Sequence, residues 1–74
     1  MIGLEVEVVN SPNEAEIGLR GKVVLDKKNA LVILSEDNKK KVILKKNRVF
    51  KFKRDGKIFI IDGDAIIGKY YSRI

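Results

Sequence analysis

Hydrophobic and polar residues alternate with a period of two in two short segments of the chain. In residues 4–8 apolar side chains alternate with glutamates, and in residues 49–53 they alternate with lysines. This period is typical of a strand that buries one face. The run at 30–34 is apolar throughout, which predicts burial on both faces or a place at a barrel seam. That run and three further segments rich in Val, Ile and Leu are also predicted to be strands, so the four ranges are 22–26, 30–34, 41–44 and 58–61.

Turn-forming residues separate these segments. An Asp-Gly pair at residues 55–56 predicts a tight hairpin, and Gly18 and Gly21 predict a tight bend or a close approach of two backbones. Six short strands with turns about every eight to twelve residues predict an all-β fold, a small SH3-like or Sm-like antiparallel barrel of five to six strands. Residues 14–19 could hold a short helical turn, and the tail from 64 to 74 could hold another or form an edge strand.

Length and composition narrow the picture further. The 74 residues provide for one domain, residues 1–74, with no room for a second core. The chain has no cysteine and no histidine, so disulfides, thiolate metal sites and the commonest general base are excluded. No apolar stretch approaches the roughly 20 residues that span a bilayer, and the first residues lack the pattern of a signal peptide. We therefore expect a cytoplasmic protein with no membrane partner.

The net charge of +6 is unevenly distributed along the chain. Residues 1–38 carry four basic and seven acidic side chains, whereas residues 39–74 carry twelve basic and three acidic ones. Such an asymmetry favours a polyanionic partner, RNA or DNA, over a face that is merely solvated. The sequence therefore predicts a nucleic-acid-binding module whose second half carries most of the contacts.

The candidate contacts are mostly lysines. In the strand predicted at 49–53, Lys51 and Lys53 lie opposite Phe50 and Phe52, which places the phenylalanines in the core. Lysine-rich surfaces contact phosphates and sugars and recognise RNA by its shape. Tyrosines 70 and 71 could stack on bases or pack the tail. The candidate RNA-binding residues are Lys27, Lys28, Lys39, Lys40, Lys41, Lys45, Lys46, Arg48, Lys69 and Arg73.

The acidic residues are weak candidates for a catalytic or metal-binding site. Asp62 and Asp64 could bind Mg²⁺, but the favoured interpretation is a turn in which an aspartate caps local amides and Gly63 has a positive φ. Asp26 is expected to be a solvated acid at a strand end, and the glutamates at 5 and 7 are expected to be exposed. No serine has a histidine to activate it. We expect no catalytic residue and no bound metal or cofactor in this chain.

The central part of the sequence resembles a known signature. Residues 18–33, Gly-Leu-Arg-Gly-Lys-Val-Val-Leu-Asp-Lys-Lys-Asn-Ala-Leu-Val-Ile, resemble the Gly-x-x-Gly-x-Val-Val-x-Glu-Thr-x-Asn-Thr-Leu-x-Ile pattern of the archaeal ribonuclease P protein component 1 family. The lysine pair before Phe50, the Ile-Asp-Gly at 61–63 and the final Arg73 continue the resemblance almost to the end of the chain. The departures are Asp26-Lys27 for Glu-Thr, Ala30 for Thr, Leu44 for Pro and Lys69-Tyr70 for Arg-Pro.

This resemblance implies an Sm-like barrel in the ribonucleoprotein enzyme that removes the 5′ leader from precursor tRNA. Catalysis would belong to the RNA subunit and its bound Mg²⁺, and this chain would be a non-catalytic subunit. The implied partners are ribonuclease P RNA, a zinc-ribbon protein subunit and, indirectly, precursor tRNA, and we expect the isolated chain to be monomeric. One alternative is an SH3-like or Sm-like RNA-binding module of the ribosome or of translation. Another is an autonomous nuclease that uses Asp62 and Asp64.

Overall fold

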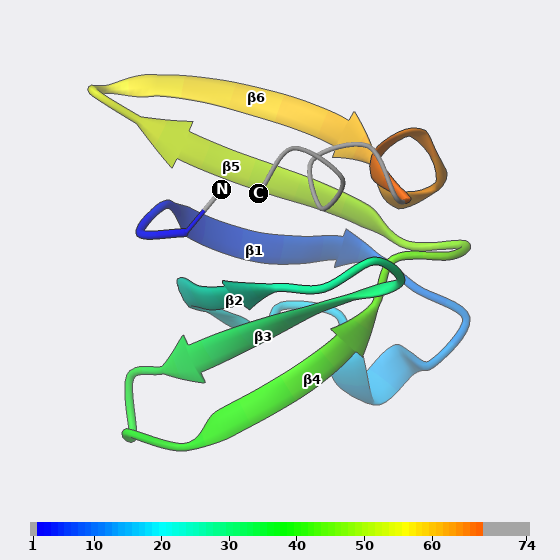
Figure 1. Ribbon diagram of the computed structural model, residues 1–74, viewed down its shortest axis with the longest axis horizontal. Coiled ribbons are helices and arrows are strands. Elements are labelled where there is room, and N and C mark those ends of the chain that lie inside the picture. Colours follow the sequence, from blue (N-terminus) through cyan, green and yellow to red (C-terminus); the bar gives the residue numbers. More distant parts are fainter. Residues whose placement is uncertain (1, 68–74) are drawn as a thin grey trace.

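The computed structural model describes residues 2–67, which form six strands and two 3₁₀ helices (Figure 1). Each predicted strand is present within one or two residues of its expected bounds, and the two 3₁₀ helices confirm the helical turns expected at both ends. No helix among the described residues is long and apolar enough to cross a membrane. The elements are β1 (Glu5–Asn10), η1 (Glu14–Glu16), β2 (Arg20–Asp26), β3 (Ala30–Ser35), β4 (Lys40–Leu44), β5 (Val49–Arg54), β6 (Lys57–Asp62) and η2 (Gly63–Ile66).

The strands form one antiparallel sheet in the order β4-β3-β2-β1-β5-β6. In Figure 1 the sheet curves so that β3 and β4 lie on one side of β1, and β5 and β6 lie on the other. The register shifts between Val8 and Asn10 and between Val23 and Leu25, and such bulges bend a strand. Among residues 2–67 no ladder joins β4 to β6, so the predicted barrel is barrel-like but open along this seam.

The core follows the alternation that the sequence displays. Val6 and Val8 of β1 and Phe50 and Phe52 of β5 are all at most 3% exposed, and the two phenylalanine rings lie 6.0 Å apart. The first four residues of β3, 30–33, are all buried, as expected from its unbroken apolar run. The η2 helix adds Ile66 to the same core. The predicted buried faces of β1 and β5 are therefore confirmed, as is the burial on both faces that was one of the two alternatives for β3.

Glycines allow two close backbone approaches. At Gly21 a Cβ would lie 2.7 Å from Cγ2 of Ile33 and would meet the carbonyl oxygen of Leu34, which confirms the predicted close approach. Gly18 has a φ of +90°, as a tight bend requires. The positive φ predicted for Gly63 is wrong. This glycine is buried, its N–H donates to the Arg48 carbonyl at 2.7 Å, and a side chain would collide with the β4–β5 loop.

Candidate nucleic-acid interface

Some of the predicted cations come together at one end of the molecule. The β2–β3 turn and the β4–β5 loop lie side by side there because Ala30 pairs with Leu44 and the Lys45 amide donates to the Asn29 carbonyl at 2.9 Å. Both connections lie at the right in Figure 1. Their cations form a cluster, called the loop surface, that consists of Lys27, Lys28, Lys46 and Arg48.

The three consecutive lysines at positions 39–41 lie away from the loop surface. They stand at the β3–β4 turn and the start of β4, whereas the loop surface begins beyond the last residue of β4. The four residue steps of this strand place the two clusters about 13 Å apart along it. Lys39 and Lys40 are exposed, but Lys41 shares a strand face with buried Ile43 and is half-buried. The predicted contacts thus do not form one continuous surface.

One of the predicted RNA contacts, Lys45, is buried in the structure. Its side chain is 0% exposed, and its Nζ lies 2.8 Å from Oδ1 of Asp26 and 3.2 Å from the carbonyl oxygen of Ile66. The side chain of Asp26 is itself only 6% exposed, so the expectation of a solvated turn acid is also wrong. A buried charge needs a partner of opposite sign. Lys45 therefore joins the end of β2 to η2 in the interior and is out of reach of a phosphate.

Arg48 is held in place by the segment that follows β1. Its Nε lies 3.0 Å from Oε1 of Glu16, and its Nη1 donates to the Lys46 carbonyl at 3.0 Å. The hydroxyl of Ser11 donates to the same glutamate oxygen at 2.7 Å. Partial burial alone raises the pKa of Glu16, but the hydrogen bonds from Ser11 and Arg48 and the charge of Arg48 outweigh it and lower the pKa. The guanidinium consequently has a defined orientation at the edge of the loop surface.

The two aspartates around Gly63 serve the backbone. Oδ1 of Asp62 accepts from the Asp64 amide at 3.1 Å, and Oδ1 of Asp64 accepts from the Asn47 amide at 3.0 Å. The favoured interpretation of a capped turn is confirmed in this respect. In residues 2–67 there is no group of three acidic side chains that could hold a metal ion. These carboxylates fix the β4–β5 loop against η2.

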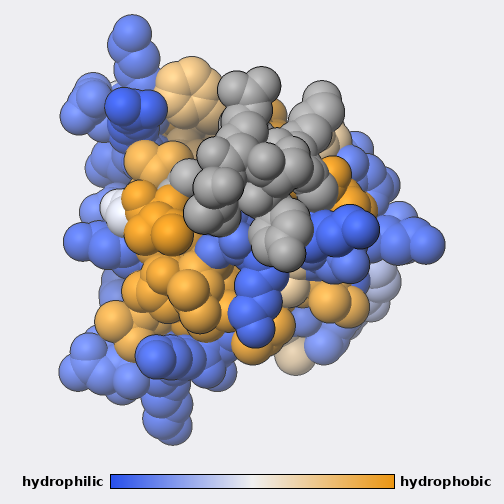
Figure 2. Space-filling model, in the orientation of Figure 1, coloured by the Kyte–Doolittle hydropathy of each residue, from blue (hydrophilic) through white to orange (hydrophobic). Residues whose placement is uncertain are grey.

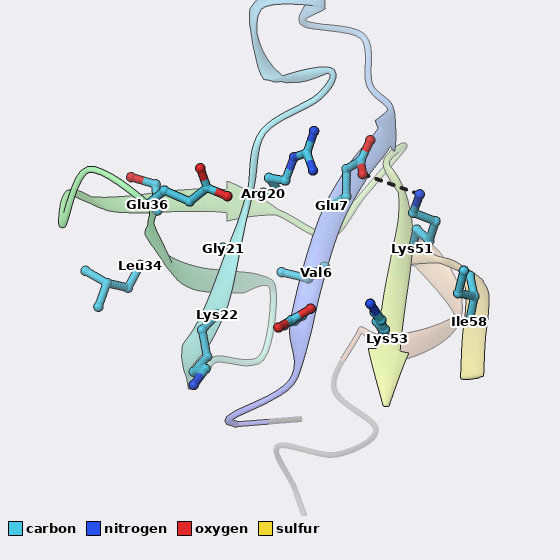
Figure 3. Close-up of a pocket in the computed structure, with 12 residues that line it drawn as sticks. Val6, Glu7, Arg20, Gly21, Lys22, Leu34, Glu36, Lys51, Lys53 and Ile58 are labelled. Atoms are coloured by element: carbon cyan, nitrogen blue, oxygen red, sulfur yellow. Dashed lines mark ion pairs between the residues drawn. The ribbon is translucent and has the colours of Figure 1, made fainter. Parts of the chain in front are cut away.

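A second charged surface covers the outer face of β2, β1 and β5. Glu5 pairs across the sheet with Lys22 on one side and Lys53 on the other, and Glu7 pairs in the same way with one cation of each neighbouring strand. These side chains line a hollow of about 470 Å³ (Figure 3). We call it the charged groove, after the six charged residues that β1, β2 and β5 contribute to it: Glu5, Glu7, Arg20, Lys22, Lys51 and Lys53. A seventh charged residue, Glu36 of the β3–β4 turn, also lines the hollow.

The cations of the charged groove were missed as contacts at the level of sequence. The alternation in residues 49–53 already placed Lys51 and Lys53 on one outward face, and the alternation in residues 4–8 did the same for the glutamates. Only the strand order sets these two rows beside each other. The sequence does contain one signal for this arrangement. The glutamates of residues 4–8 and the lysines of residues 49–53 carry opposite charges, and opposite charges favour cross-strand pairing.

Both edge strands of the open sheet expose apolar side chains beyond the lysines at their first residues. In β4, Val42 and Leu44 are 61% and 51% exposed, and in β6 the residues Ile58, Phe59 and Ile60 are all at least 46% exposed. Figure 2 shows apolar side chains gathered on the face drawn, with hydrophilic side chains around them. These apolar stretches are poorly suited to phosphates, whereas the exposed cations lie on the loop surface, at the β3–β4 turn and in the charged groove.

Four residues considered from the sequence lie outside the described residues. They are Lys69 and Arg73, which were predicted as RNA contacts, and Tyr70 and Tyr71, which were considered for base stacking. Their roles remain predictions.

Comparisons with known proteins agree on one family. The family model described as ribonuclease P/MRP, subunit p29, matches residues 1–74. Ribonuclease P protein component 1 of Archaeoglobus fulgidus is 48% identical over 73 residues, which cover 99% of this chain and 71% of the relative. Its counterpart in Methanocaldococcus jannaschii is 43% identical over 74 residues, 100% of this chain and 78% of the relative. A solved structure, Mth11, described as a homologue of human RNase P protein Rpp29, matches with a TM-score of 0.71 and 32% identity over 99% of this chain and 95% of Mth11.

Proposed function

The chain belongs to the ribonuclease P/MRP subunit p29 family, and on this premise we propose that it acts as a non-catalytic, RNA-binding protein subunit of ribonuclease P. The observation that carries the proposal is the similarity to ribonuclease P components along the whole length of the chain, together with the shared fold. The subunit would support the RNA in removing the 5′ leader from precursor tRNA.

The described cations support a role in holding RNA rather than in cutting it. Lys27, Lys28 and Lys46 are exposed at one end of the molecule, and Lys39 and Lys40 are exposed at the β3–β4 turn. Contacts of this kind orient a nucleic acid through its phosphates, and they offset the repulsion between RNA segments that pack together. The Mg²⁺ ions needed for cleavage would be held by the RNA, since Asp62 and Asp64 are engaged with backbone amides.

The proposed partners follow from family membership. They are the ribonuclease P RNA, a small zinc-ribbon protein subunit and, through the RNA, the precursor tRNA. We propose that the isolated chain is a monomer and that the assembly works in the cytoplasm. The copurification of this chain with ribosomes, and not with ribonuclease P RNA, would favour the alternative of a translation-associated module.

Reconstitution of the enzyme tests this function. Adding the chain and its partner subunits to the cognate ribonuclease P RNA should increase leader cleavage of precursor tRNA at limiting Mg²⁺. The triple variant Lys27→Gln/Lys28→Gln/Lys46→Gln should lose much of the increase. The matched control is Lys57→Gln in the β5–β6 hairpin, which removes a cation outside the proposed contacts. If the wild-type chain never increases cleavage under any Mg²⁺ concentration, the proposed function is wrong.

A further inference from the structure

In the charged groove the glutamates of β1 lie between the cations of β2 and those of β5. We propose that the charged groove binds double-stranded RNA across the minor groove. The cations of β2 and β5 would contact the two phosphate backbones, and the glutamates of β1 would accept hydrogen bonds from 2′-hydroxyl groups between them. This inference rests on the proposed function, because it names the form of RNA that one face of the subunit binds. It adds a contact surface that shares no residue with the loop surface.

The spacing of the strands supports a duplex. Neighbouring strands lie about 4.8 Å apart, so the cations of β2 and those of β5 are separated by about 10 Å across β1. Figure 3 shows Arg20 and Lys22 on one side of β1, and Lys51 and Lys53 on the other. The minor groove of A-form RNA is wide and shallow and is bordered by two phosphate backbones. Two rows of long basic side chains on either side of a floor can follow these two backbones.

The glutamates distinguish a duplex from a single phosphate chain. Glu5 and Glu7 line the hollow between the two rows of cations. A carboxylate only accepts hydrogen bonds, so it repels a phosphate but binds a hydroxyl group through a charge-assisted hydrogen bond. The minor groove of A-form RNA displays 2′-hydroxyl groups between its backbones. The order of cation, carboxylate and cation therefore matches the order of phosphate, hydroxyl and phosphate.

The six side chains are available for these contacts. Val6, between the two glutamates, is buried in the core, so both glutamates and their cross-strand partners project from the outer face. Nζ of Lys51 lies 3.4 Å from Oε1 of Glu7. The Lys51 side chain is 38% exposed and the Glu7 side chain is 27% exposed. A single, partly exposed pair at this distance restrains its side chains only weakly. Within residues 2–67, the other three cations of the groove make no ion pair.

The glutamates provide the sharpest test, because two models predict opposite results. The probes are an RNA duplex of about 16 base pairs and a 2′-fluoro duplex of the same sequence, which keeps the A-form but lacks the hydroxyl donors. Wild type should prefer the RNA duplex by about tenfold, the effect of one or two charge-assisted hydrogen bonds. In Glu5→Gln/Glu7→Gln this preference should fall towards one. General electrostatics predicts instead that the more basic variant binds both duplexes more tightly, with an unchanged ratio.

Two further variants complete the experiment. Lys22→Gln/Lys53→Gln should bind the RNA duplex at least tenfold more weakly at low salt, with a dependence of log K on log salt that is less steep by roughly 2. The control Glu14→Gln/Asp55→Asn removes two acids outside the groove and should keep the wild-type ratio between the duplexes. Equal urea midpoints for all variants would show that each is folded.

The outcomes separate this inference from the proposed function. If wild type does not discriminate between the duplexes, or if Lys22→Gln/Lys53→Gln retains its duplex affinity, the inference is overturned, even if the chain still binds the cognate ribonuclease P RNA. If that variant instead loses affinity for a protein subunit of ribonuclease P and not for RNA, the groove is a protein interface and the inference is equally overturned. Failure of wild type to bind the cognate RNA would contradict the proposed function itself.

Discussion

Replacing Lys45 with methionine removes a fully buried cation and keeps most of its volume. The change leaves the Asp26 carboxylate, whose side chain is 6% exposed, without the ammonium group that lies 2.8 Å from it. Removing one partner of a buried ion pair costs about 3–5 kcal/mol, because the other charge stays buried and uncompensated. A domain of this length has a free energy of unfolding of roughly 4–11 kcal/mol. Lys45→Met should therefore lose a large part of the stability, and the melting temperature should fall by at least about 12 °C.

Urea unfolding followed by circular dichroism measures this loss. Lys46→Met is the matched control, since Lys46 is the next residue and is exposed, and its effect should stay within about 0.5 kcal/mol. The double variant Lys45→Met/Asp26→Asn removes both charges and should recover part of the lost stability. A cost of less than about 1 kcal/mol for Lys45→Met, or one equal to that of Lys46→Met, would refute the assignment of Lys45 as an interior partner of Asp26.

Three other predictions follow from the same structure. Gly63→Ala should cost about 1–3 kcal/mol in urea unfolding, because its Cβ would meet carbonyl oxygens of the β4–β5 loop; an unchanged midpoint would contradict the close approach. The pKa of Glu16 is lowered in the folded state, so its contribution to stability is complete above the ordinary carboxyl pKa and is lost as the pH falls through the lowered value. Unfolding midpoints of wild type and Glu16→Gln should therefore converge in acid, and a difference independent of pH would exclude this linkage. Lys27→Gln/Lys28→Gln/Lys46→Gln should reduce the slope of log K against log salt for ribonuclease P RNA by roughly 2 to 3, and a slope equal to that of wild type would show that the loop surface makes no phosphate contact.

Much of the fold could be predicted from local patterns. The alternation in residues 4–8 and 49–53 identified two strands and their buried faces, and the apolar run at 30–34 identified a strand buried on both faces. The Asp-Gly pair at 55–56 marked the β5–β6 hairpin, where both residues have positive φ. These features depend on neighbours in sequence, so the sequence is sufficient to reveal them. The open seam between β4 and β6 depends on the bending of the whole sheet and had no local signal.

The sequence by itself determined the strands, the family and the number of positive charges, and the tertiary structure decided where those charges act. Lys45 and Lys46 are identical neighbours in the sequence, yet one is buried against Asp26 and the other is exposed. The direction of a side chain in a loop is set by the packing of distant segments, and no sequence period encodes it. Likewise, Glu5 stands between Lys22 and Lys53 only because β1 pairs with both β2 and β5. Contacts between residues so far apart in the chain arise from strand pairing, and this is why the charged groove became visible only in the folded molecule.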